Sequence, residues 1–103
     1  MTGFVLHPDA FDDLDEIWEF IAADNPGAAD RVIEEVYEAV RGLVRLPRQG
    51  HRRLDLCSQP LRFLPVRDLL IAYAPDEKPL LVIAVLHDRR NPRVLAALLR
   101  QRM

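Results

Sequence analysis

Cysteine, lysine and long hydrophobic runs are scarce in this sequence of 103 residues. Cys57 is the single cysteine, so no intrachain disulfide can form, which fits a reducing compartment. No activating group is apparent in the sequence beside its thiol, and we interpret it as a structural or incidental residue. No apolar stretch approaches the roughly 20 residues that a membrane-spanning helix needs. Met1-Thr2-Gly3-Phe4 lacks the basic region and apolar stretch of a secretory signal. We therefore expect a cytoplasmic protein with no membrane partner.

A metal or cofactor site is also not indicated. The three histidines are scattered, and no pair of acidic residues has the spacing of metal ligands. Half of the residues are hydrophobic and 29% are charged, which is typical of a folded globular protein. The length suits one core, so we expect a single domain over residues 1–103.

The charges are distributed unevenly along the chain. Residues 1–40 hold eleven Asp and Glu against one basic residue, Arg31, whereas residues 41–103 hold thirteen Lys and Arg against five acids. Lys78 is the only lysine, so the basic half is an arginine surface suited to phosphate and carboxylate contacts. Either the two halves face different partners, or acidic helices neutralise a basic sheet within one molecule.

The stretch from Leu80 to Arg90 organises the expected fold. Seven apolar residues rich in Val, Ile and Leu follow Pro79, and they end in His87-Asp88-Arg89-Arg90. Their length and β-branched content favour a strand covered on both faces over a buried helix segment. The polar end is either a site presented by a central strand or simply the place where the strand meets water.

Three Pro residues indicate helix starts. Pro8 follows a short apolar run at residues 4–6 that we interpret as a first strand, and an apolar stripe with acids opposite runs from Asp9 to Ala22. Trp18 is expected to anchor the core between helices. Asn25-Pro26 starts a second helix that ends before Pro47, and the two helices should pack as an antiparallel hairpin. Asn91-Pro92 starts a short C-terminal helix, which must dock on the domain or on a partner.

The part between the hairpin and this last helix is expected to hold a loop and a sheet. Residues 48–60 show no period and suit a surface loop, in which His51 is most simply solvated. Residues 61–66 indicate a strand that Pro65 places at an edge or a bulge. A tight turn at Arg67-Asp68 leads into a strand at residues 69–74, and a Pro-rich turn leads into the Leu80 strand. The three strands predict an antiparallel meander.

These segments together resemble the ParE/RelE toxin superfamily of type II toxin–antitoxin systems, and its ParE-like branch in particular. The resemblance rests on the segment from Pro8 to Ile21, on Asn25-Pro26 with Ala28-Ala29-Asp30-Arg31, and on Leu46-Pro47-Arg48-Gln49-Gly50. It continues through Leu61-Arg62-Phe63-Leu64-Pro65-Val66, Leu70-Ile71-Ala72-Tyr73 and Val85-Leu86-His87-Asp88-Arg89-Arg90. The helix from Pro92 extends beyond the ending of many ParE proteins.

The resemblance implies an α+β domain with four strands. An antiparallel helix hairpin packs on one face of a mostly antiparallel sheet, and a short C-terminal helix follows. It further implies a toxin of the plasmid-stabilisation type that inhibits DNA gyrase, forms a hetero-oligomer with a ParD-like antitoxin, and uses no catalytic residue or cofactor for this. By the same analogy, an amphipathic antitoxin segment lies in an apolar groove between hairpin and sheet, with its acids near the arginines.

Two alternatives remain on the same fold. RelE-like members cut messenger RNA in the ribosome, which requires a base, an acid and cations. The candidates for that chemistry are His87, Arg62, Arg67, Arg89 and Tyr73. The other alternative is a non-toxic member that only binds its antitoxin. The residues expected to bind target or antitoxin are Arg62, Arg67, His87, Arg89 and Arg90. The basic half could equally contact nucleic acid or an acidic antitoxin segment.

Overall fold

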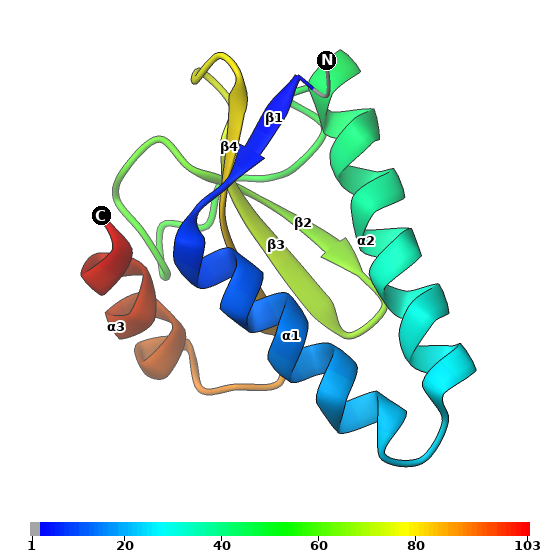
Figure 1. Ribbon diagram of the computed structural model, residues 1–103. Coiled ribbons are helices and arrows are strands. Elements are labelled where there is room, and N and C mark those ends of the chain that lie inside the picture. Colours follow the sequence, from blue (N-terminus) through cyan, green and yellow to red (C-terminus); the bar gives the residue numbers. More distant parts are fainter. Residues whose placement is uncertain (1–2) are drawn as a thin grey trace.

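The structure is a computed structural model that describes residues 3–103. It is an α+β fold in which three helices surround a four-stranded sheet (Figure 1). The elements, in chain order, are β1 (Phe4–Leu6), α1 (Pro8–Ala22), α2 (Pro26–Arg45), β2 (Arg62–Val66), β3 (Leu69–Ala74), β4 (Leu80–His87) and α3 (Pro92–Arg102). All seven elements predicted from the sequence are confirmed, with boundaries that agree to within a residue or two.

The sheet has the strand order β1-β4-β3-β2. β2, β3 and β4 form the predicted antiparallel meander, and the short β1 pairs in parallel with the start of β4. β4 is therefore an interior strand over its first half, as its continuous apolar run predicts. β2 is an edge strand, which explains why Pro65 is tolerated there.

Each face of the sheet carries its own apolar cluster. The hairpin of α1 and α2 packs on one face, where Leu14, Val36 and Val40 meet Ile71 and Val82. α3 packs on the opposite face with the loop before β2. The buried side chains there include Leu56, Phe63, Leu70, Ile83, Leu86, Leu95 and Leu99. The C-terminal helix thus docks on the domain itself, and it completes the two-sided burial of β3 and β4.

The helices begin where the proline signals place them. Pro8, Pro26 and Pro92 each occupy the first helical turn, where the missing N–H has no intrahelical partner to lose. Asn25 caps α2 by accepting the N–H of Ala28 at 3.0 Å. His7 caps α1 in the same manner, because its Nδ1 accepts the N–H of Asp9 at 3.0 Å.

Trp18 corrects one sequence expectation. Its side chain is 39% exposed and lies at the surface of the hairpin rather than in the core. It does connect the two helices, because its indole N–H donates to Asp30 Oδ1 at 2.9 Å. The indole needs a hydrogen-bond partner, and an acid on the neighbouring helix near the surface supplies one.

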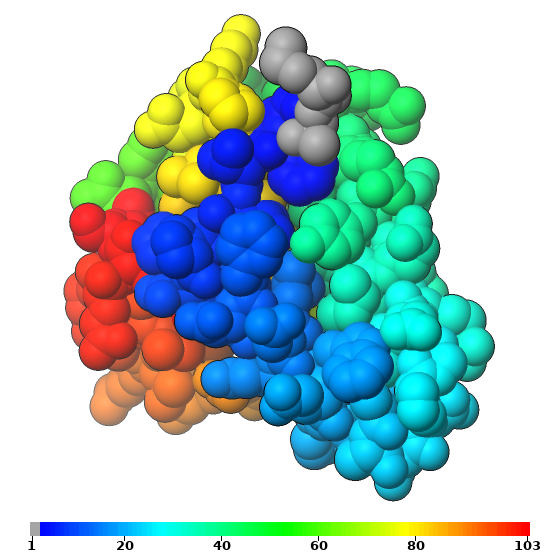
Figure 2. Space-filling model, in the orientation of Figure 1, coloured from blue at the N-terminus to red at the C-terminus, as the bar shows by residue number. Residues whose placement is uncertain are grey.

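The two charged halves of the chain meet in a few specific ion pairs. Arg67 in the β2–β3 turn pairs with Glu35 of α2, and Arg102 of α3 pairs with Asp13 of α1. The space-filling view shows α3 lying beside the N-terminal half of α1 (Figure 2). Within residues 3–103, no ion pair involves Asp12, Asp15, Glu16 or Glu19, the remaining acids along α1. The acidic helices therefore neutralise part of the basic half of the chain, and several acids of α1 are left without an ion pair among residues 3–103.

Candidate functional site

Four of the predicted residues lie at the end of the sheet where β4 ends, and we call Arg67, His87, Arg89 and Arg90 the His87 cluster. The register pairs Leu69 with His87, so the β2–β3 turn lies directly beside the end of β4. The backbone N–H of Asp88 donates to Asp68 O at 3.0 Å and fixes this approach. The cluster is therefore built by the antiparallel ladder, which brings two segments about 20 positions apart to one end of the sheet.

The arginines of the cluster are held differently. Arg67 has a left-handed backbone with φ of 55°, and its guanidinium makes a two-pronged contact with Glu35 at 2.8 and 2.6 Å. The Arg67 guanidinium lowers the pKa of Glu35 by this hydrogen bond. Arg89 is 82% exposed and reaches Asp68 only at 3.4 Å. Arg67 thus connects the β2–β3 turn to α2, whereas Arg89 and the exposed Arg90 present their charge to solvent.

Arg62 and Tyr73 lie at the other end of the sheet. They pair across β2 and β3, and Arg62 Nη1 donates to Gly50 O at 2.7 Å and to Arg48 O at 3.4 Å. The five residues expected to bind a target or antitoxin are consequently divided, with four in the His87 cluster and Arg62 outside it. The predicted meander carries a signal for this division, because Arg62 and Arg67 stand at opposite ends of one short strand.

Tyr73 is a buried structural residue. Its side chain is fully buried, its hydroxyl donates to Pro47 O at 2.6 Å, and the same oxygen accepts the N–H of Gly50 at 2.9 Å. Burial raises the pKa of the Tyr73 hydroxyl above its ordinary value. A proton carrier must reach its substrate, and this hydroxyl is enclosed and fully engaged by backbone. Tyr73 is therefore unsuited to the proton transfer that the endonuclease alternative would require of it.

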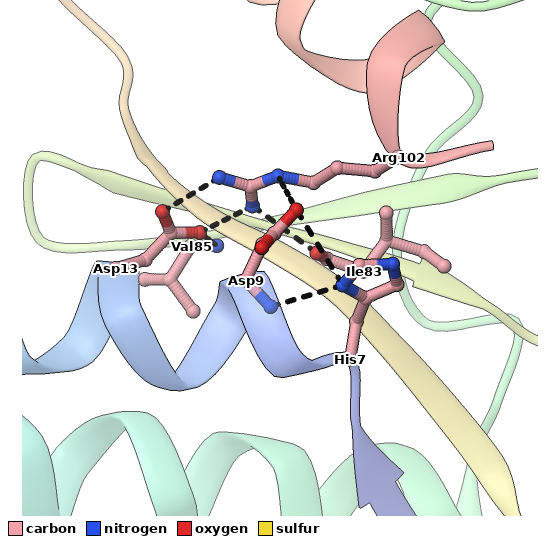
Figure 3. Close-up of polar contacts among 6 residues, drawn as sticks. All are labelled: His7, Asp9, Asp13, Ile83, Val85 and Arg102. Atoms are coloured by element: carbon pink, nitrogen blue, oxygen red, sulfur yellow. Dashed lines mark hydrogen bonds and ion pairs between the residues drawn. The ribbon is translucent and has the colours of Figure 1, made fainter.

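The most enclosed charged contact joins α1 and α3, and the sequence analysis did not identify it. The guanidinium of Arg102 bonds both carboxylate oxygens of Asp13, at 2.6 and 2.8 Å, and lies 3.7 Å from Asp9 (Figure 3). Only 10% of the Arg102 side chain and 13% of the Asp13 side chain are exposed. The Asp13 hydrogen bonds raise the pKa of Arg102. Two residues 89 positions apart leave no local pattern; the only hint is that Asp13 borders the apolar stripe of α1.

This ion pair also protects the edge of β4. β1 pairs with β4 only from Leu80 to Val82, which would leave the following backbone groups open. Asp13 Oδ2 accepts the N–H of Val85 at 3.0 Å, and Arg102 Nη1 donates to the carbonyl of Ile83 at 3.2 Å. The two side chains take the positions of a neighbouring strand, as Figure 3 shows. An open strand edge invites unwanted pairing, and here the chain satisfies it internally.

A cleft of about 450 Å³ lies between α1, the end of β4 and α3, beside the His87 cluster. Its lining is mixed, with Phe20 and Leu98 among apolar residues, Asp12 and Glu16 among acids, and Arg90 as an exposed cation. The interface between hairpin and sheet is itself filled by the core. An apolar cleft of about 510 Å³ does lie where the end of α2 meets β1 and the start of β4, with Phe4, Val44 and Leu80 in its lining.

Other classes of site find no support among residues 3–103. No group of three His, Cys, Asp or Glu side chains is arranged to hold a metal ion in that part of the chain. None of the helices the structure describes is both long enough and apolar enough to span a bilayer. The His87 cluster itself consists of exposed guanidinium groups and one half-buried imidazole.

A hairpin of helices on one face of a four-stranded sheet, with a C-terminal helix, is the architecture that the resemblance implies. Residues 4–92 match the family model of the ParE toxin of type II toxin–antitoxin systems, parDE. The chain belongs to this ParE toxin family. The matched segment ends at the first residue of α3, so nearly all of that helix lies outside it. No curated protein matches the chain.

Proposed function

We propose that this toxin acts as a ParE-type inhibitor of DNA gyrase in the cytoplasm and is neutralised by a cognate ParD-like antitoxin in a hetero-oligomer. The match to the ParE family over residues 4–92 is the observation that carries the proposal. An inhibitor that binds its target needs an accessible surface and no reacting group. The exposed guanidinium groups of Arg89 and Arg90 suit that requirement.

The endonuclease alternative is less well supported by the positions of its candidate residues. Cleavage would require a base and an acid around one phosphate, with cations beside them. Tyr73 is enclosed at the opposite end of β3 from His87, and Arg62 binds backbone carbonyls next to it. His87 alone, with Arg89 and Arg90, leaves the second proton carrier unassigned. For this reason we place gyrase before the ribosome as the target.

The antitoxin is proposed to bind along the helix hairpin and to reach the His87 cluster. On the side of α1 that faces this cluster, the hairpin exposes Phe20, which is 76% exposed and lines the cleft with His87 and Arg90. This aromatic group can receive an apolar side chain of an amphipathic segment. Acidic residues of the same segment would then pair with Arg89 and Arg90 near the cleft beside α1.

The decisive experiment measures two activities of the purified toxin. Gyrase supercoiling of plasmid DNA is assayed for inhibition and for trapped, cleaved DNA, and a cell-free translation reaction is assayed for messenger-RNA cleavage. We expect gyrase to be inhibited and translation to continue. Translation arrest with cleaved message and an unaffected gyrase would replace the proposal with the endonuclease.

Growth assays address the third possibility. Induction of the toxin without the gene that neighbours it should stop growth, and co-expression of that gene should restore it. Unaffected growth, together with a stable complex of the two products, would identify a non-toxic member that only binds its antitoxin.

A further inference from the structure

A different cleft lies at the loop end of the sheet, far from the His87 cluster. It encloses about 620 Å³ between the end of α2, the loop that follows it and the β3–β4 turn. Leu46, Pro47 and Pro75 contribute an apolar floor, and Leu46 is 65% exposed although it is a large aliphatic residue. A lone exposed leucine is common on protein surfaces, but here Leu46 and Pro47 together give a concave surface an apolar floor.

The rim of this cleft is cationic. Arg45, Arg48 and Lys78 line it, and Asp76 is the one acid among the lining residues. Arg48 pairs with Asp76 at 3.1 Å, but both side chains are more than 60% exposed, so solvent weakens the contact. Within the described part of the chain, Arg45 and Lys78 make no ion pair. Two cations therefore remain available to a partner.

The buried Tyr73 and the half-buried Arg62 anchor the loop of this cleft. The Tyr73 hydroxyl bonds Pro47 O and Gly50 N–H, and the Arg62 guanidinium bonds Gly50 O. Gly50 is required here, because an added Cβ would lie 2.6 Å from the Tyr73 hydroxyl and 2.9 Å from a backbone oxygen. A surface held rigid in this way loses less conformational entropy when a partner binds.

We propose that this loop-end cleft is a docking surface for an acidic, extended segment of a partner protein, with an apolar residue of the segment seated on Leu46 and Pro47. Carboxylates on either side of that residue would pair with Arg45 and Lys78. A nucleic acid suits the cleft less well, because none of its lining residues is an aromatic on which a base could stack. The inference does not depend on whether gyrase or the ribosome is the target.

The test uses fluorescence anisotropy with the intact toxin and a labelled synthetic peptide of glutamates around one leucine. The double variant Arg45→Glu with Lys78→Glu should weaken binding about tenfold or more. The matched control, Arg93→Glu with Arg100→Glu on α3, changes the net charge equally away from this cleft and should have little effect. Leu46→Ser should weaken binding by roughly fivefold and leave its salt dependence unchanged. All five substituted residues are exposed, so the variants should fold, which circular dichroism can check.

Several results would overturn the proposal. Equal losses in the two double variants would mean that only the overall charge attracts the peptide. Tighter binding of a DNA duplex through Arg45 and Lys78 would assign the surface to nucleic acid instead. The toxin could also form concentration-dependent dimers that the Arg45 and Lys78 variant abolishes. That result would mean that the acidic α1 of a second copy of this chain occupies the cleft. Absence of saturable peptide binding to the unmodified toxin would also end the proposal.

Discussion

The two ends of the central sheet hold similar side chains and use them in opposite ways. At the loop end, Arg62 and Tyr73 are turned inward and bond the backbone of residues 47–50. At the other end, Arg89 and Arg90 are exposed, and the ion pair of Arg89 with Asp68 is long and exposed. An arginine or a tyrosine in a motif therefore does not by itself indicate a site. What decides is whether the fold already satisfies its hydrogen bonds.

Arg102 belongs with the inward-facing group, although it lies between the two ends. Replacing it by alanine should produce the largest loss of stability, about 3 kcal/mol in the free energy of unfolding, because Asp13 would keep a poorly solvated charge without a partner. Chemical denaturation measures this loss. Arg100→Ala on the exposed side of the same helix is the matched control and should have little effect. Equal values for the two variants would contradict the role assigned to this ion pair.

Tyr73→Phe tests the loop end directly and should have the next largest effect. The ring would still fill the core, but Pro47 O and Gly50 N–H would lose their partner, at a cost of about 2 kcal/mol. Thermal and chemical denaturation report the change, and Tyr37→Phe serves as the control. A stability equal to that of the unmodified protein would show that water replaces the hydroxyl without cost. The Tyr73 contacts would then not be what fixes the loop.

Alkaline pH provides a smaller and independent test of the same residue. Burial raises the pKa of Tyr73 above the ordinary 10.0, so the folded protein holds this proton more tightly than the unfolded chain does. Stability from this group is therefore fully present below pH 10 and is lost as the pH rises above it. Denaturation midpoints measured across this range should fall more steeply for the unmodified protein than for Tyr73→Phe. Parallel slopes would contradict the inference.

The order and bounds of the elements could be predicted because local signals determine them. Pro8, Pro26 and Pro92 mark helix starts, Pro47 follows the end of α2, and the β-branched run of β4 requires cover on both faces. Each of these signals acts within a few residues of its own position. A family resemblance added that the first strand and the meander form one four-stranded sheet with the hairpin on one face, which the local patterns leave open.

The site could be predicted only in part, because its assembly depends on contacts between distant residues. The polar end of β4 was visible in the sequence, and the antiparallel register adds Arg67 to it. Arg62 and Tyr73 are separated from that set because they lie at the other end of β2 and β3, where they bond the backbone of residues 47–50. The pairing of Asp13 with Arg102 depends on how α3 docks, which no local pattern specifies.

The smallest effect on stability is expected at the outward-facing end. Arg89→Ala should leave the free energy of unfolding unchanged within about 0.5 kcal/mol, because its side chain is largely solvated. The same variant should reduce toxicity only partly in a growth assay, since a binding surface loses affinity one contact at a time.

His87→Ala distinguishes gyrase inhibition from RNA cleavage. An RNA-cleaving enzyme would lose activity by orders of magnitude without its proton carrier, whereas a gyrase inhibitor would weaken only severalfold. A complete loss of toxicity in His87→Ala, with the fold and antitoxin binding intact, would therefore reverse the order of the two proposed functions.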